Sequence, residues 1–217
     1  MSYKYVIFDF DGTIADTSEG VTASIIYALE SYGIEVPSEE VLRRFFGPPL
    51  VAGFMKNVNV DEETAEKLTA QYRQLYNDNA MYLLELYDGM GELLERLKED
   101  KIKMAIASSK PRKFFDRLLR HLEITDYFDA VSGASLDDKD SGKKEIIENA
   151  CNILGVEDKS EVIMVGDRHY DINGAKEAGI KCIAVTFGFG SREEFEEAGA
   201  DYIVDSPKEV YELIKNK

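Results

Sequence analysis

The sequence predicts an α/β fold in which a doubly wound parallel sheet carries an inserted α-helical domain. The apolar run at 3–9 ends in acidic residues, which is typical of a buried strand. The stretch at 16–84 then holds helical patterns and no strand-like run. Beyond it, strand-like and helical segments alternate, as in a parallel sheet with right-handed crossovers. We therefore expect a core domain of residues 1–15 and 85–217, interrupted by a helical domain at 16–84.

Three helices are expected in the inserted segment. A capping box at Asp16, with a glutamate three residues later, opens a helix that ends at Gly33. Ser38 opens the next helix, which stops at the loop Gly47-Pro48-Pro49. Asp61 opens a third, long helix. The loop is either a substrate-specificity loop of this domain or a simple helix stop.

Further strands are expected in the core domain. They lie at 102–108, 130–132, 161–165, 181–186 and 201–205. Pro111 is expected to begin a helix after the first of these strands, because proline is favoured at the first helical position. A polar loop at 135–142 precedes a helix that begins at Lys143, and a later helix ends at Gly179.

Composition and charge restrict the partners of the chain. Hydrophobic residues make up 44% of the 217 residues and charged residues 31%, as in globular proteins. The net charge is -16 and basic residues are scattered, which argues against binding of a nucleic acid polymer. No apolar run has the ~18 residues of a membrane span, and the start lacks the features of a signal peptide. Cys151 and Cys182 lie in apolar segments, as buried thiols do. We expect a cytoplasmic protein without a membrane partner.

Polar residues gather where the predicted strands end. Ligands of open parallel sheets bind beyond the carboxyl ends of the strands. The polar residues at these ends are Asp9, Asp11, Ser108, Asp167 and Asp171, and Lys143 begins a helix on the same side. If the fold is right, these side chains converge on one site.

Asp9 and Asp11 form the most informative pair. Alternation along a strand end points both carboxylates the same way, and Gly12 permits a tight turn whose N–H groups approach phosphate oxygens. Two adjacent carboxylates repel each other, so a cation or a shared proton is expected. A turn-forming or helix-capping pair is the structural alternative. An EF-hand calcium loop is excluded, because Gly12 is fourth from Asp9 and Gly20 occupies the twelfth position.

Together, these segments resemble the four motifs of the haloacid dehalogenase superfamily, in the right order over nearly the whole chain. The motifs are Asp9-Phe10-Asp11-Gly12-Thr13, Ser108, Lys143 and Gly166-Asp167-Arg168-His169-Tyr170-Asp171. The helical insert resembles the small helical cap of that superfamily. Three shorter segments resemble its phosphoglycolate phosphatase-like branch, which includes 5′-nucleotidase-like members. These are Phe46-Gly47-Pro48-Pro49-Leu50, Tyr87-Asp88-Gly89 and Ser109-Lys110-Pro111.

The resemblance implies a magnesium-dependent phosphatase that acts on a small phosphorylated metabolite. Asp9 is then the nucleophile that forms an aspartyl-phosphate, and Asp11 protonates the leaving oxygen and later activates water. The implied Mg²⁺ ligands are Asp9, the backbone carbonyl of Asp11, and Asp167, with Asp171 supporting or joining that shell. An acid at position 11 favours phosphatases over dehalogenases, which lack one there.

The same resemblance implies a set of phosphate-binding residues. These are Gly12, Ser108, Ser109 and Lys143. Lys143 is followed by Lys144, where the branch usually has proline, so either lysine can be the ligand; the spacing to the following helix favours Lys143. His169 lies between the acids of the last motif and is expected to be exposed and non-catalytic.

Two alternative functions share these residues. A β-phosphoglucomutase-like phosphomutase returns the phosphoryl group to a sugar instead of releasing phosphate. A non-catalytic partner-binding protein can retain the same fold, although the acids, Ser108 and Lys143 are all present.

Overall fold

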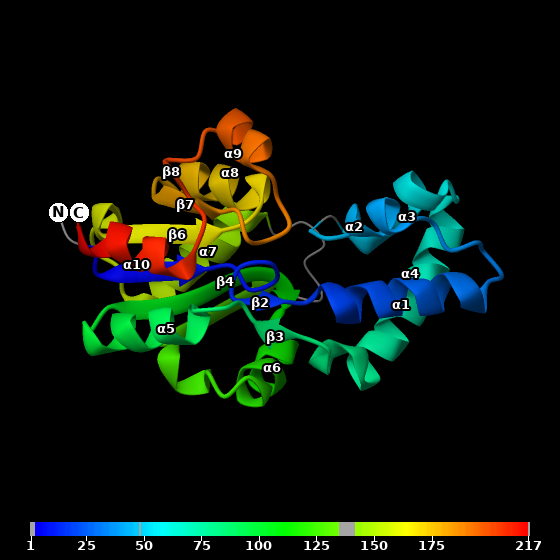
Figure 1. Ribbon diagram of the computed structural model, residues 1–217, viewed down its shortest axis with the longest axis horizontal. Coiled ribbons are helices and arrows are strands. Elements are labelled where there is room, and N and C mark those ends of the chain that lie inside the picture. The colour runs from blue at the N-terminus through cyan, green and yellow to red at the C-terminus, as the bar shows by residue number, and fades with distance from the viewer. Residues whose placement is uncertain (1–2, 48, 135–141, 217) are drawn as a thin grey trace. The chain divides into compact units, whose positions relative to one another are not determined.

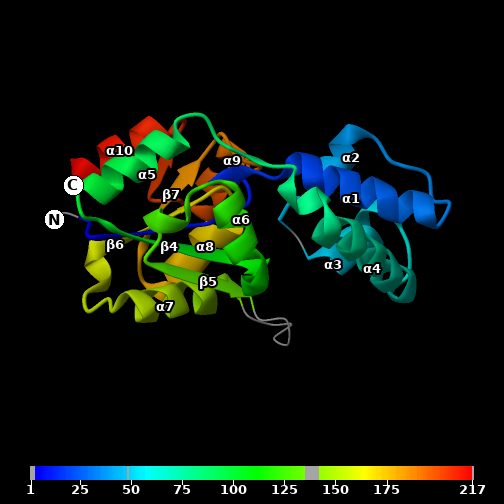
Figure 2. The ribbon, with the colours of Figure 1, turned by 90° about the horizontal axis from the view of Figure 1, so that it is seen from below.

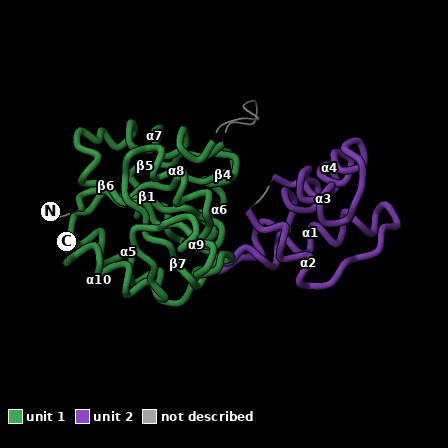
Figure 3. Tube along the Cα trace, turned by 90° about the horizontal axis from the view of Figure 1, so that it is seen from above, with its two compact units in different colours: residues 1–15, 86–217 green, residues 16–85 purple. Residues whose placement is uncertain are grey.

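The computed structural model describes residues 3–47, 49–134 and 142–216 (Figure 1). Pro48 of the expected cap loop, and all but the last residue of the expected polar loop at 135–142, lie outside the described residues. The chain divides into two compact units, shown in green and purple in Figure 3. One consists of Met1–Ala15 and Leu86–Lys217, and the other of Asp16–Glu85.

The larger unit is built on a six-stranded sheet, in which every neighbouring pair of strands is parallel. The strands are β1 (Tyr5–Phe8), β4 (Lys103–Pro111), β5 (Ala130–Ala134), β6 (Val162–Gly166), β7 (Lys181–Val185) and β8 (Tyr202–Val204). Their order is β5-β4-β1-β6-β7-β8. The predicted doubly wound parallel sheet is therefore confirmed.

Helices cover both faces of this sheet. They are α5 (Met90–Glu99), α6 (Phe115–His121), α7 (Lys143–Leu154), α8 (His169–Ala178), α9 (Arg192–Ala198) and α10 (Pro207–Lys215). Helices α7, α8 and α9 pack on one face, whereas α5 and α10 lie side by side on the other (Figure 2). The described part of this unit also contains the short 3₁₀ turns η2 (Arg112–Phe114), η3 (Thr125–Tyr127) and η4 (Lys159–Glu161).

Burial on both faces explains why the strands read as continuous apolar runs. Val6, Ile7 and Phe8 of β1 are fully buried, and each such side chain contributes about 1.5 to 3 kcal/mol to stability. From β1 the chain builds β4 and β5 on one side and returns to build β6, β7 and β8 on the other. The strand order therefore reverses beside β1, which is where open α/β sheets bind ligands.

The smaller unit is helical. It contains α1 (Ser18–Ser31), α2 (Glu39–Arg43), α3 (Leu50–Val58), α4 (Glu62–Asp78) and the 3₁₀ turn η1 (Ala80–Tyr82). Two-residue strands, β2 (Ala15–Asp16) and β3 (Glu85–Leu86), pair where the chain enters and leaves it. None of the helices in the described parts of the chain combines the length and the apolar character that a membrane span requires.

Two expectations for the smaller unit are wrong. The predicted capping box at Asp16 is absent: α1 begins at Ser18, and Asp16 instead accepts a hydrogen bond from the Ser18 N–H at 2.9 Å. The nine-residue helix α3 was not predicted, because the prolines before it indicate a stop and its apolar pattern is short. The helix expected from Asp61 does form, and the Asp61 side chain caps it by accepting from the Thr64 N–H.

The expected end of β4 is also wrong. The prediction ended this strand at Ser108 and placed Pro111 in a helix, but β4 continues to Pro111 and α6 begins only at Phe115. Pairing with β5 drives the extension, since Pro111 lies opposite Ala134 after an irregularity in register. Lys110 consequently lies within strand β4.

Candidate active site

The site is built where β1 and β6 end side by side. Phe8 pairs with Val165 in the register of these strands, and the Asp9 N–H donates to the Val165 carbonyl at 2.9 Å. Asp9 is the first residue after β1, and Asp167 is the first residue after β6. Two acids separated widely in sequence therefore meet at one edge of the sheet.

A cluster of three acids forms at this edge. Asp9, Asp167 and Asp171 each offer a carboxylate oxygen, and these oxygens lie within 4.8 Å of one another. Burial, followed by repulsion from Asp171 and Asp9, raises the pKa of Asp167. Burial also raises the pKa of Asp171 to about 6, although the ammonium group of Lys143 opposes the shift. The cluster is therefore a buried concentration of negative charge that favours a cation.

Lys143 joins two members of this cluster. Its Nζ lies 3.0 Å from Oδ1 of Asp9 and 2.6 Å from Oδ1 of Asp171, and only 6% of its side chain is exposed. Burial alone would lower the pKa of Lys143, but the two carboxylates outweigh it and raise the pKa above its ordinary value. Lys143 is therefore charged at the position where it contacts the predicted nucleophile.

The stem of Lys143 reaches the cluster because α8 lacks a side chain at Gly174. A Cβ atom added to Gly174 would lie 2.8 Å from both Cβ and Cγ of Lys143. This distance is too short for two carbon atoms, so a larger residue at Gly174 would displace the lysine. The sequence reasoning gave Gly174 no role, and only the packing of α7 against α8 reveals it.

Asp11 has a different partner. Nζ of Lys110 lies 3.0 Å from Oδ1 of Asp11, with 9% of the lysine side chain and 27% of the aspartate side chain exposed. The sequence reasoning used Lys110 only as part of a family motif and assigned it no role. Its position follows from the extension of β4 beyond Ser108, which a strand ending at Ser108 does not anticipate.

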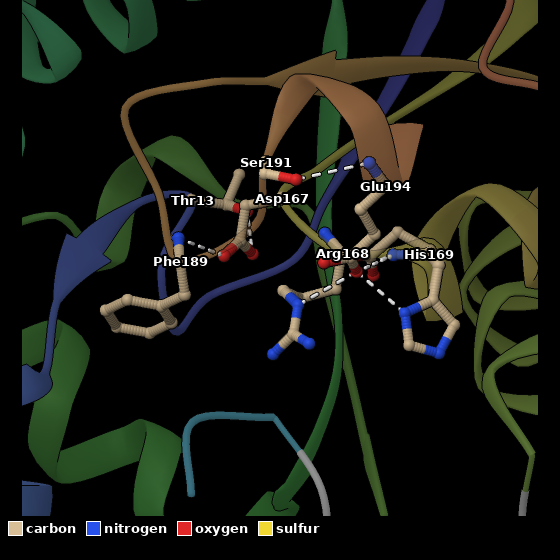
Figure 4. Close-up of polar contacts among 8 residues, drawn as sticks. Thr13, Asp167, Arg168, His169, Phe189, Ser191 and Glu194 are labelled. Atoms are coloured by element: carbon tan, nitrogen blue, oxygen red, sulfur yellow. Dashed lines mark hydrogen bonds and ion pairs between the residues drawn. The ribbon is translucent and has the colours of Figure 1, made fainter. Parts of the chain in front are cut away.

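The turn after Asp11 lies against Asp167. Gly12 has a φ of 81°, and a Cβ atom there would lie 2.2 Å from Oδ2 of Asp167. The Gly12 N–H donates to the Ala15 carbonyl at 2.9 Å, and its role in phosphate binding stays a prediction. The Thr13 hydroxyl donates to Oδ1 of Asp167 at 3.0 Å, and the Phe189 N–H donates to Oδ2 at 2.8 Å (Figure 4).

The predicted phosphate-binding serines lie at the same sheet edge, on the strand that pairs with β1. Ser108 is buried, with 2% of the residue exposed, and its Oγ accepts a hydrogen bond from the Lys110 N–H at 3.3 Å. Ser109 is exposed. Their contacts to phosphate stay predictions.

The charges of the site fit a divalent cation. The carboxylates of Asp9, Asp11, Asp167 and Asp171 and the ammonium groups of Lys110 and Lys143 meet here. When all four acids are ionised, their negative charges exceed the two positive charges by two. Mg²⁺ binds oxygen ligands such as carboxylates, and such an ion would oppose the burial and the repulsion that raise the pKa of Asp167.

A second charged cluster supports the turn that follows Asp167 (Figure 4). Oε1 of Glu194, in α9, lies 3.0 Å from Nε of Arg168 and 2.7 Å from Nδ1 of His169. Burial alone would raise the pKa of Glu194, but hydrogen bonds from His169 and the charge of Arg168 outweigh it and lower the pKa. His169 was expected to be exposed; its side chain is 37% exposed and engaged with Glu194.

Comparison with known proteins identifies the family. Residues 6–185 match the family model described as haloacid dehalogenase-like hydrolase. The chain is 36% identical over 194 residues to a 5′-nucleotidase of Pseudomonas aeruginosa, covering 89% of this chain and 87% of that protein. It is 32% identical over 212 residues to the tyrosine-protein kinase PtkA of Mycobacterium tuberculosis, covering 98% and 72%.

A solved structure agrees over the full length. A protein from Clostridium acetobutylicum, described as a predicted phosphatase, superimposes with a TM-score of 0.90 at 42% sequence identity, and 99% of each chain is covered. The chain therefore belongs to the haloacid dehalogenase-like hydrolase family. The resemblance drawn from the four motifs is confirmed at the level of the superfamily.

Proposed function

We propose that this enzyme is a Mg²⁺-dependent phosphatase that hydrolyses a small phosphate monoester through an aspartyl-phosphate on Asp9. The observation that carries the proposal is the carboxylate of Asp9, held between the ammonium of Lys143 and the buried acids Asp167 and Asp171. The phosphatase class is supported by the hydrolase family and by relatives named a 5′-nucleotidase and a predicted phosphatase.

Asp9 is suited to attack phosphorus because its orientation is fixed. Its Oδ1 accepts from the Phe10 N–H at 2.7 Å and contacts Nζ of Lys143 at 3.0 Å. In the first step a carboxylate oxygen of Asp9 bonds to phosphorus, and the bond between phosphorus and the leaving oxygen breaks. During this step the ammonium of Lys143 neutralises charge on the phosphoryl oxygens, and the Ser108 hydroxyl donates a hydrogen bond to them.

Asp11 handles the protons in both steps. In the first step its carboxyl group gives a proton to the leaving oxygen, so that an alcohol departs. In the second step it takes a proton from water, the water oxygen bonds to phosphorus, and the bond to Asp9 breaks to release phosphate. Lys110, 3.0 Å from Oδ1 of Asp11, holds this carboxylate in place.

The residues that would hold Mg²⁺ are Asp9, Asp167 and the backbone carbonyl of Asp11, with Asp171 beside them. When bound, the ion supplies positive charge to the phosphoryl oxygens during transfer. We further propose that the helical unit Asp16–Glu85 acts as a cap that selects the leaving group. The buried free thiols of Cys151 and Cys182 fit a reducing, cytoplasmic setting.

A substrate screen tests this proposal. Phosphate release is measured with Mg²⁺ for phosphoglycolate, nucleoside 5′-monophosphates, sugar phosphates and p-nitrophenyl phosphate, with Asp9→Asn as the control. We expect Mg²⁺-dependent hydrolysis by the wild type of at least one phosphoglycolate-like or nucleotide substrate, and none by the variant. No hydrolysis of any ester would overturn the proposal and favour a non-catalytic binding protein.

Two arms of the same screen address phosphoryl transfer to an acceptor other than water. With β-glucose 1-phosphate, a phosphomutase yields glucose 6-phosphate, whereas a phosphatase yields free phosphate. Because one relative is named a tyrosine kinase, ATP with a tyrosine-containing peptide is included. Formation of phosphotyrosine in that arm would show that the enzyme transfers the phosphoryl group to a protein tyrosine instead of to water.

A further inference from the structure

The turn that carries Asp167 is held by hydrogen bonds on two sides. On one side, the Arg168 N–H donates to Oδ2 of Asp171 at 3.0 Å. On the other side, a single oxygen of Glu194, Oε1, receives three contacts from the turn (Figure 4). These come from the His169 N–H at 2.8 Å, Nδ1 of His169 at 2.7 Å and Nε of Arg168 at 3.0 Å. An ionised carboxylate only accepts, so Nδ1 of His169 carries the hydrogen in this contact.

Glu194 is itself rigidly placed. The Ser191 Oγ accepts from the Glu194 N–H at 3.2 Å and so caps α9 at its first turn. The next residue, Phe195, is fully buried against the sheet core. Just before this helix, the Phe189 N–H donates to Oδ2 of Asp167. The segment 189–194 therefore contacts Asp167 directly, and it also forms hydrogen bonds with Arg168 and His169.

We propose that Glu194 is a positioning residue for the metal site, acting through Arg168 and His169 to hold Asp167 in the orientation that binds Mg²⁺. The inference rests on the proposed function, because it assigns Asp167 as a metal ligand. Groups that orient ligands from outside the coordination shell commonly change metal affinity by about 10- to 100-fold when they are removed. Two features distinguish Glu194 from an ordinary surface acid. Only 23% of its side chain is exposed, and it contacts both Arg168 and His169 on the same turn.

The rival explanation is that Glu194 only docks α9 on the core. A docking role predicts a lower melting temperature with unchanged metal affinity. A positioning role predicts weaker metal binding, measured without substrate, and a loss of turnover that is largest at low Mg²⁺ and shrinks as Mg²⁺ is raised. The two roles therefore separate in a binding measurement.

The experiment is Mn²⁺ binding followed by electron paramagnetic resonance, together with the Mg²⁺ dependence of p-nitrophenyl phosphate hydrolysis. For Glu194→Gln, which keeps the size of the side chain but removes its charge, we expect the Mn²⁺ dissociation constant to rise about tenfold. Glu193→Gln is the matched control, because it removes the same charge from an exposed neighbouring position in α9. We expect its dissociation constant to stay within twofold of wild type, about 0.4 kcal/mol.

A second variant keeps the test valid if Glu194→Gln does not fold. Arg168→Gln removes the same ion pair from the other side, and we expect the same direction of change in Mn²⁺ affinity. In the double variant the two losses should be less than additive, because the contact between Arg168 and Glu194 is common to both single variants. Unchanged Mn²⁺ affinity in folded Glu194→Gln or Arg168→Gln would overturn the inference. Absence of Mn²⁺ binding and of hydrolysis in the wild type would instead overturn the proposed function.

Discussion

Two pairs of aspartates lie at the sheet edge, each following a strand, but the environments of the two pairs differ. Asp9 and Asp11, after β1, have side chains that are 14% and 27% exposed. Asp167 and Asp171, from the segment after β6, are 0% and 1% exposed. The first pair is therefore accessible to a substrate, whereas the second is enclosed by the core.

The partners of the two pairs differ in the same way. Asp11 is neutralised by the lysine Lys110, which extends from a neighbouring strand. Asp167 is held by short, fixed donors, the Thr13 hydroxyl and the Phe189 N–H. Burial, followed by repulsion from Asp171 and Asp9, raises the pKa of Asp167, and a bound cation would oppose this shift. The comparison supports the proposal that the side chains of the first pair carry out the chemistry, with Asp9 also a metal ligand, and that the second pair contributes to ion binding alone.

The largest expected effect is at the nucleophile. Asp9→Asn keeps the shape of the side chain but removes the attacking oxygen, so we expect turnover to fall by at least about 10⁴-fold. The measurement is Mg²⁺-dependent hydrolysis of p-nitrophenyl phosphate. Circular dichroism serves as the control and should show an unchanged fold. Activity near that of wild type would remove Asp9 from its role.

Asp11→Asn should cost less, and its cost should depend on the leaving group. General acid–base groups contribute about 10²- to 10⁴-fold, and an alkyl phosphate needs the proton more than p-nitrophenyl phosphate does. We expect the loss of kcat/KM to be greater for an alkyl phosphate. An equal loss for both esters would show that Asp11 does not protonate the leaving oxygen.

The Asp167→Asn variant tests whether the buried pair binds the metal ion. At a Mg²⁺ concentration of 100 times the dissociation constant, a single site stabilises the wild type by about 2.7 kcal/mol. We expect Mg²⁺ to raise the melting temperature of the wild type and to have little effect on this variant. Adding EDTA to the wild type should reverse the increase. A variant that still responds fully to Mg²⁺ would place the ion elsewhere.

The smallest expected effect is at Gly174 of α8, where the stem of Lys143 packs against the helix. Gly174→Ala introduces a carbon 2.8 Å from Cβ of Lys143, and we expect a loss of about 1 to 3 kcal/mol in the free energy of unfolding. Gly91→Ala in α5 is the control, because its added Cβ meets nothing within 4 Å, and alanine should stabilise that helix by about 0.5 to 1 kcal/mol. Urea unfolding compares the two variants, and equal stabilities would contradict the predicted contact.

Local patterns in the sequence were sufficient to predict the parallel sheet and the start of α7 at Lys143. Strands that are buried on both faces appear in the sequence as continuous apolar runs. The polar residues that follow these runs indicate the edge of the sheet at which the site lies. The extension of β4 to Pro111 was missed because it depends on pairing with β5. That error also concealed the contact between Lys110 and Asp11.

Glu194 was missed for a related reason. Helix α9 contains four glutamates in seven residues, and no local pattern separates the one that faces the core. Only the tertiary packing of α9 against α8 brings its carboxylate to Arg168 and His169. Charged side chains on one helix are alike in sequence, and their burial and partners distinguish them.

The most direct test of the account is to trap the covalent intermediate. The enzyme is mixed with a ³²P-labelled phosphate ester and Mg²⁺, quenched with acid within milliseconds, and mapped by peptide digestion. We predict label on the peptide that contains Asp9, released by hydroxylamine as an acyl phosphate is, and no label on Asp9→Asn. Label on another residue, or rapid turnover with no labelled protein at any time, would contradict the central claim.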